Sequence, residues 1–197
     1  MAAEKEQVTV GSREDWRAWL SEHHASSPGI WLVTWKKNSG GPHLPYDDIV
    51  KEALAFGWVD SLPRKLDDRR SQLLLTPRKQ GSNWSRANKQ RVERLLAADL
   101  LAPAGLAVIE GAKADGSWTA LDDVENLVEP DALRAALDAE PEARRQWDAF
   151  PRSAKRGILE WILNARTDAT HDKRVRDTAT LAAKGERANQ WRGQAQR

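Results

Sequence analysis

The sequence has 197 residues, of which 40% are hydrophobic and 30% are charged, and its net charge is +2. This length suits one domain, or one domain with a smaller appendage, and it excludes two large domains. The apolar content and the low net charge exclude a disordered chain. Because the sequence contains no cysteine, disulfide frameworks, thiolate catalysis, iron–sulfur clusters and cysteine-based zinc sites are excluded as well.

The N-terminal residues do not predict an export signal. Residues 1–10 carry Glu4, Lys5 and Glu6 and no long apolar stretch, which is unlike a signal peptide. The densest apolar runs, at 29–35 and 95–109, are too short or too interrupted to span a bilayer. We therefore expect a cytoplasmic protein without membrane insertion.

The first part of the chain is predicted to alternate helices and strands. Ser12 suits the N-cap of a helix that runs to residue 24. Residues 29–37 are rich in β-branched and aromatic residues and predict a strand, which a loop rich in Gly and Pro follows at 38–45. Apolar residues at helical spacing then predict a second helix over 46–56.

Two further strands are expected after this helix, which Gly57 is suited to end. They cover 58–66 and 71–77 and are joined by a charged turn at 67–70. Pro63 has no N–H for a central ladder, so the first of these strands is expected at an edge of the sheet or with a bulge.

From residue 82 onward the pattern is helical. Ser82 or Ser85 is predicted to cap one helix, and apolar positions over 154–165 mark one face of a longer one. Further helix starts are predicted at Pro103, Pro130 and Pro141, and Asp168 is predicted to cap the last helix, with Gly116 and Gly185 as helix ends.

These patterns predict an α+β fold. A small antiparallel sheet of about three strands packs with helices, and an all-α C-terminal subdomain follows it. The expected divisions are an α/β body over 1–116, an acidic linker over 117–129, a helical subdomain over 130–187 and a frayed tail over 188–197.

The charges alternate along the chain. Residues 64–94 and 151–197 are basic, whereas residues 101–150 are acidic. Two interpretations are open: the opposite charges pair across one globule, or 64–94 forms an anion-binding face. Under the second interpretation, nucleic acid is a candidate partner of the basic segments.

The sequence contains no recognisable metal, cofactor or catalytic motif. The four histidines lack metal-ligand spacing, and neither a Walker loop nor GxGxxG is present, so we expect no metal and no cofactor. Ser61 follows Asp60 but has no histidine nearby in the sequence. A metal-independent enzyme that acts through these two residues stays open as an alternative, and no catalytic residue is assigned.

Residues 76–89 are the best candidate for a binding site. A basic strand end leads through a loop to a helix start, where free N–H groups and the helix dipole favour an oxyanion. Trp84 would supply a flat wall for a ring; the simpler interpretation places Trp84 in the core and gives the serines a capping role. The candidate ligand-binding residues are Asp60, Ser61, Arg64, Arg78, Lys79, Ser82, Trp84, Ser85, Arg86 and Asn88.

Several stretches resemble one known family. Residues 57–61, 65–68 and 76–85 read Gly-Trp-Val-Asp-Ser, Lys-Leu-Asp-Asp and Thr-Pro-Arg-Lys-Gln-Gly-Ser-Asn-Trp-Ser. They are similar to the signature of the YdeI/OmpD-associated, or bacteriocin-protection, family. The C-terminal patterns at 130–133 and 158–166 resemble the same family.

The resemblance implies an N-terminal body similar to the YjbR/CyaY-like superfamily and a helical C-terminal domain. It also implies a role in tolerance to bacteriocins or antimicrobial peptides, and it supplies no catalytic residue. We therefore expect a cytoplasmic stress- or antimicrobial-tolerance-associated protein that binds a small anionic or aromatic ligand. The open alternatives are nucleic-acid binding, an enzyme that modifies a toxin or small molecule, and a pure protein-interaction role.

Overall fold

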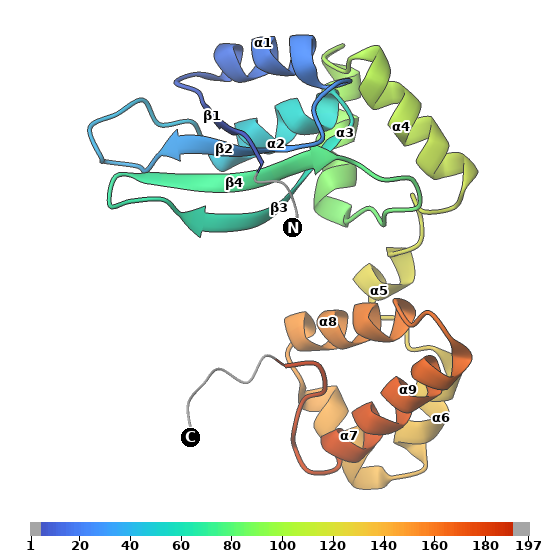
Figure 1. The fold of residues 1–197 in the computed structure, drawn as a ribbon. Helices are drawn as coiled ribbons and strands as arrows, with labels where there is room; N and C mark the ends of the chain where they lie inside the picture. The colour runs from blue at the N-terminus through green and yellow to red at the C-terminus, as the bar shows by residue number, and fades with distance from the viewer. Residues whose placement is uncertain (1–4, 191–197) are drawn as a thin grey trace. The chain divides into compact units, whose positions relative to one another are not determined.

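The computed structural model describes residues 5–190, and the chain divides into two units, residues 1–120 and 121–197. The first unit combines a sheet with helices, and the second is helical (Figure 1). Each unit has its own hydrophobic core. The predicted fold class, α+β with a helical C-terminal part, is confirmed. Within residues 5–190, no helix combines the length and the apolar character that crossing a membrane requires.

The N-terminal unit is built on a four-stranded sheet with the order β1-β2-β4-β3. Its strands are β1 (Gln7–Thr9), β2 (Ile30–Trp35), β3 (Trp58–Lys65) and β4 (Arg70–Pro77). β1 pairs in parallel with β2, and the other pairs are antiparallel, so the sheet is mixed. The expectation of about three antiparallel strands missed β1, because three residues are too few to show a periodic pattern.

β3 lies at the edge of the sheet and is irregular, as Pro63 predicted. The register with β4 shifts between Asp60, which is opposite Leu75, and Pro63, which is opposite Leu73. Directly opposed residues share one face of a sheet, and both leucines belong to the hydrophobic core. Asp60 therefore lies on the face of the sheet that the helices cover.

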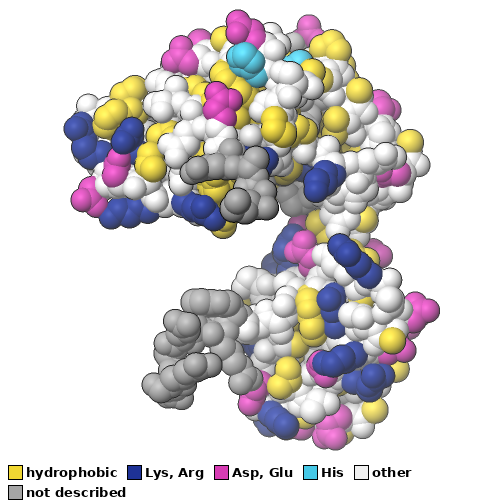
Figure 2. All heavy atoms as spheres, in the orientation of Figure 1, with side chains coloured by type: hydrophobic (Ala, Val, Ile, Leu, Met, Phe, Trp, Pro, Cys, Tyr) yellow, Lys and Arg dark blue, Asp and Glu magenta, His cyan; other side chains and the backbone are white. Residues whose placement is uncertain are grey.

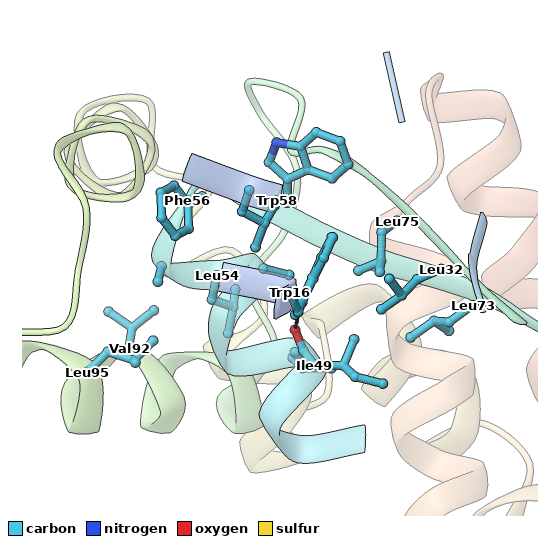
Figure 3. Packing of buried hydrophobic residues seen from close by; sticks show 14 of the residues in the cluster. Trp16, Leu32, Ile49, Leu54, Phe56, Trp58, Leu73, Leu75, Val92 and Leu95 are labelled. Carbon is cyan, nitrogen blue, oxygen red and sulfur yellow. Dashed lines mark hydrogen bonds between the residues drawn. The ribbon is translucent and has the colours of Figure 1, made fainter. Parts of the chain in front are cut away.

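Helices α1 (Arg13–His23) and α2 (Tyr46–Ala55) pack on this face. The Ser12 hydroxyl caps α1 by accepting from the Asp15 N–H at 3.0 Å, as predicted. Trp16 is fully buried, and its Nε1–H donates to the Ile49 carbonyl at 3.1 Å. In Figure 3 these two side chains lie beside the buried leucines of β2 and β4. The core thus fixes the position of α2 over the sheet.

Helices α3 (Arg86–Ala97) and α4 (Pro103–Ala114) complete the N-terminal unit. Gly105 of α4 approaches α2 so closely that a Cβ there would lie 2.3 Å from the Ala55 carbonyl oxygen. The same carbonyl accepts from the Ala102 N–H at 3.0 Å. Since a side chain at 105 would have to displace backbone, this contact requires glycine and fixes α4 beside the end of α2.

The C-terminal unit buries the apolar faces of its helices against one another. Thr167, rather than the predicted Asp168, caps the last helix, because its hydroxyl accepts from the Thr170 N–H at 3.2 Å. Ala188, in the predicted tail, is buried, and residues 191–197 lie outside the described part of the chain. The helices of this unit are α5 (Asp122–Asn126), α6 (Asp131–Asp138), α7 (Pro141–Ala149), α8 (Arg152–Leu163) and α9 (Asp168–Ala182).

Candidate ligand-binding site

A pocket of about 410 Å³ lies between helix α4 and the loop that follows β4. Its volume falls within the range of about 300–1,000 Å³ that is usual for small-molecule sites. The pocket, which we call the loop pocket, is lined by Arg78, Lys79, Gln80, Gly81, Ser82, Trp84, Ala107, Val108, Gly111, Ala112, Asp115 and Ser117.

Arg78 supplies a positive charge at this pocket. Its Nη1 donates to the Asn83 carbonyl at 3.0 Å, and its guanidinium carbon lies 3.8 Å from the centre of the Trp84 ring. Burial lowers the pKa of Arg78 to about 10, although the Asp60 carboxylate acts in the opposite direction. The guanidinium is therefore still charged at neutral pH, and among residues 5–190 no carboxylate forms an ion pair with it.

Buried polar groups without partners are concentrated at the loop pocket. Four buried side-chain N or O atoms within residues 5–190 lack a hydrogen-bond partner. Three of them, Arg78 Nε, Trp84 Nε1 and Ser117 Oγ, belong to residues that line the loop pocket. Because buried polar groups in folded proteins are nearly always paired, this concentration makes the loop pocket the candidate binding site.

Asp115 ties the loop to the end of α4. Its two carboxylate oxygens accept from the backbone N–H groups of Gly81, at 3.1 Å, and Ser117, at 2.9 Å. Gly81 has a φ of +73°, a conformation that favours glycine. These two hydrogen bonds fix the loop against the end of α4 at the edge of the pocket.

The structure brings four of the ten predicted site residues together, because Arg78, Lys79, Ser82 and Trp84 all line the loop pocket. The other three residues of the predicted segment, Ser85, Arg86 and Asn88, lie at the start of α3 and do not line it. The Ser85 hydroxyl is the N-cap and accepts from the Asn88 N–H at 3.4 Å. The loop pocket thus lies beside the loop that precedes α3, and a binding role for the first turn of this helix stays a prediction.

The remaining candidates lie on β3. Asp60 and Ser61 line a different pocket, and the Arg64 guanidinium lies 4.5 Å from the centre of the Trp31 ring. These residues were predicted to share a site with Arg78 because they are polar and belong to the same stretch of the chain. The structure separates them, and an enzymatic role for Asp60 and Ser61 stays a prediction.

Trp84 is 1% exposed and supports the pocket from within. Its ring packs against Trp118, with 4.9 Å between ring centres, and carries the Arg78 guanidinium. This arrangement matches the interpretation that placed Trp84 in the core. Its indole N–H nevertheless belongs to the unpartnered donors, so Trp84 can act as a hydrogen-bond donor, while stacking of a ligand ring on it stays a prediction.

The wall that α4 contributes was not predicted from the sequence. Its residues are small or apolar, and they show only the spacing of an ordinary helix. Gly111 could have drawn attention to this wall, because glycine is unfavourable in the interior of a helix. In the structure, a Cβ at Gly111 would meet nothing within 4 Å, so the glycine leaves space rather than a close contact.

Some of the basic residues that suggested nucleic acid are paired with carboxylates. Arg91 Nε lies 2.8 Å from Asp47, and Arg70 Nη2 lies 2.8 Å from Asp67. On the face drawn in Figure 2, Lys and Arg side chains lie among Asp and Glu side chains. Nucleic-acid binding stays a prediction. Across residues 5–190 there is no group of three or more His, Cys, Asp or Glu side chains that could hold a metal ion.

The structure defines a protein with an α+β unit, which contains a pocket of small-molecule size, followed by a helical unit. Residues 8–108 match a domain of unknown function (DUF8412) over more than half of the chain, and the chain belongs to this family. Residues 126–185 match the family described as bacteriocin-protection, YdeI or OmpD-associated. No curated protein and no solved structure matches the chain.

The C-terminal match supports the resemblance to the bacteriocin-protection family and locates it in the helical unit. The motifs at 57–61, 65–68 and 76–85 fall within the region that the other domain covers. Similarity of the N-terminal body to the YjbR/CyaY-like superfamily stays a prediction.

Proposed function

We propose that the N-terminal unit binds a small molecule that carries a carboxylate or similar oxyanion beside an apolar ring, and that the loop pocket is its site. The unpartnered donors Arg78 Nε and Trp84 Nε1 carry this proposal. A buried donor without an acceptor destabilises a protein by about 1–3 kcal/mol. A bound oxyanion supplies acceptors for these donors and compensates the partly buried charge of Arg78.

The remaining lining residues define the rest of the ligand. Ala107, Val108 and Ala112 offer an apolar wall, and Gly111 leaves room beside it. Lys79 adds a second positive charge at the exposed side. A ligand can pack a flat apolar group on α4 and direct its oxyanion to Arg78. A hydrogen bond between the charged oxyanion and the guanidinium is stronger than one between neutral groups.

The match of residues 126–185 supports placing this binding activity in bacteriocin protection. We propose that the chain is a cytoplasmic binding protein in tolerance to bacteriocins or related antimicrobials. Binding in the N-terminal unit would then supply the small-molecule signal, and the helical unit would carry the function that its family description names.

The pocket can be tested with matched probes of one shape. Phenylacetate carries the carboxylate, and 2-phenylethanol is its neutral counterpart. The sequence has ten tryptophans, so indole N–H resonances in a ¹H–¹⁵N spectrum of the full chain provide a direct readout, with Trp84→Phe assigning one of them. We expect phenylacetate to shift the Trp84 resonance and to bind more tightly than 2-phenylethanol.

Gly111→Phe is expected to fill the pocket and abolish phenylacetate binding while the protein stays folded. Replacing an exposed helical glycine improves helix propensity, and Gly111→Ala is expected to stabilise the unit by about 0.5–1 kcal/mol and retain binding.

Arg78→Gln removes the positive charge of the pocket and should weaken phenylacetate binding about tenfold or more. Equal binding of phenylacetate and 2-phenylethanol, or full binding by Gly111→Phe, would contradict the proposal.

A further inference from the structure

The N-terminal unit contains a second pocket of about 440 Å³, bounded by β2, β3, β4 and the first turns of α2. It shares no lining residue with the loop pocket, and we call it the sheet pocket. Its polar residues include Asp60, which the covered face of the sheet presents toward the start of α2. Nothing in the proposed function uses this pocket.

Asp60 is a half-buried carboxylate without a cation partner. Within residues 5–190, no Lys, Arg or His nitrogen lies within 4.0 Å of it, and the Tyr46 hydroxyl donates to Asp60 Oδ2 at 2.7 Å. Burial, and then the Asp60 carboxylate, raise the pKa of Tyr46 to about 12. The phenol therefore keeps its proton at neutral pH and occupies one oxygen of Asp60, which leaves the other available to a ligand.

Lys36 and His43 also line the sheet pocket, and both make hydrogen bonds elsewhere. Lys36 Nζ donates to the carbonyls of Asp67 and Asp68, at 2.6 and 3.2 Å. His43 Nδ1 lies 2.8 Å from the Trp35 carbonyl oxygen. A carbonyl can only accept, so Nδ1 carries the proton, and in the neutral ring Nε2 is then an acceptor.

The free oxygen of Asp60 and His43 Nε2 are therefore the acceptors that this pocket offers a ligand. The loop pocket shows the opposite pattern, since its unpartnered nitrogen atoms are donors.

We infer that the sheet pocket binds an organic ammonium compound, with the charged nitrogen at Asp60 and an apolar body against the surrounding side chains. Leu44, Ile49, Pro63 and Leu73 supply the apolar part of the lining. A charged N–H donor satisfies a carboxylate more strongly than a neutral donor does. An organic cation fits better than a metal ion, because Asp60 and His43 are too few ligands for a metal site.

The same family of probes tests this inference. Phenethylamine differs from 2-phenylethanol in carrying an ammonium group, and calorimetry on the full chain measures both. We expect phenethylamine to bind at least about tenfold more tightly than 2-phenylethanol, since a hydrogen bond to a charged group contributes about 1.5–3 kcal/mol. The Asp60→Asn substitution keeps the size of the side chain and should remove that preference.

Two matched variants control for structure. Asp68→Asn removes an exposed carboxylate that pairs with Lys65 and should leave phenethylamine binding unchanged. Tyr46→Phe keeps the Asp60 carboxylate and should retain the preference for the amine, so loss of the preference in Asp60→Asn alone identifies the charge as its cause. Thermal unfolding verifies that each variant is folded.

The inference is overturned if phenethylamine binds no more tightly than 2-phenylethanol, or if Asp60→Asn binds it as the unmodified protein does. It is independent of the loop pocket: Gly111→Phe should abolish phenylacetate binding and leave phenethylamine binding unchanged, because Gly111 lines the loop pocket and not the sheet pocket. The experiment thereby distinguishes failure of the loop-pocket proposal from failure of the sheet-pocket inference.

Discussion

Replacing both Arg13 and Arg17 by Met is expected to destabilise the N-terminal unit by about 3–5 kcal/mol, because the double variant leaves a buried carboxylate without a cation. The carboxylate is that of Glu52 in α2, which is 1% exposed. Its two oxygens accept from Arg13 Nε at 2.5 Å and from Arg17 Nη1 at 2.6 Å. These contacts connect α1 to α2 across the interior.

Removing the charge of Glu52 instead of the two arginines should destabilise the N-terminal unit less. The side chains of Arg13 and Arg17 are 35% and 37% exposed, so in Glu52→Gln they can recover hydration, and we expect a loss of about 1–3 kcal/mol. Adding Glu52→Leu to the double Met variant should recover most of its stability, since apolar groups can replace a buried ion pair.

Urea unfolding followed by hydrogen exchange measures these effects for each unit separately. The expected loss of protection lies in residues 5–120 and leaves the helical unit unaffected. A double Met variant as stable as Glu52→Gln would show that burial of the unpaired carboxylate is not the dominant cost.

The boundaries of many elements could be predicted from single residues with strong conformational preferences. Ser12 and Ser85 cap helices, Pro103 begins one, and Gly57 has a φ of +76° directly after α2. Pro63 coincides with the register shift of the edge strand. These residues act through their own backbone and neighbouring N–H groups, so their effect is local and can be predicted from the sequence.

Elements and sites that depend on distant partners could not be predicted in this way. β1 exists through its pairing with β2, and the wall of the loop pocket is formed by α4, whose position depends on the close approach of Gly105 to Ala55. The separation of Asp60 from Arg78 has a similar cause. Asp60 faces the start of α2, while Arg78 lies beyond the last residue of β4.

Replacing Glu129 by Ala is expected to destabilise the C-terminal unit by about 1–3 kcal/mol more than replacing it by Gln. Glu129 Oε1 accepts from the indole Nε1–H of Trp147 at 2.7 Å, and Trp147 is 1% exposed. Gln keeps an acceptor for this buried donor, whereas Ala leaves it unpaired. Arg144, the other partner of Glu129, also contacts Asp138 and Asp148, so it keeps carboxylate partners in both variants.

The same carboxylate should make the stability of the C-terminal unit depend on pH. The hydrogen bonds from Arg144, with a further one from Trp147, hold the pKa of Glu129 below its ordinary value of 4.5. A carboxyl with a lowered folded-state pKa stabilises the fold fully above its unfolded pKa and loses that contribution as pH falls through the folded value. Urea unfolding between neutral and acidic pH should therefore show a decline in the unmodified chain that is smaller in Glu129→Gln. An equal decline in both proteins would assign the acid sensitivity to other carboxylates.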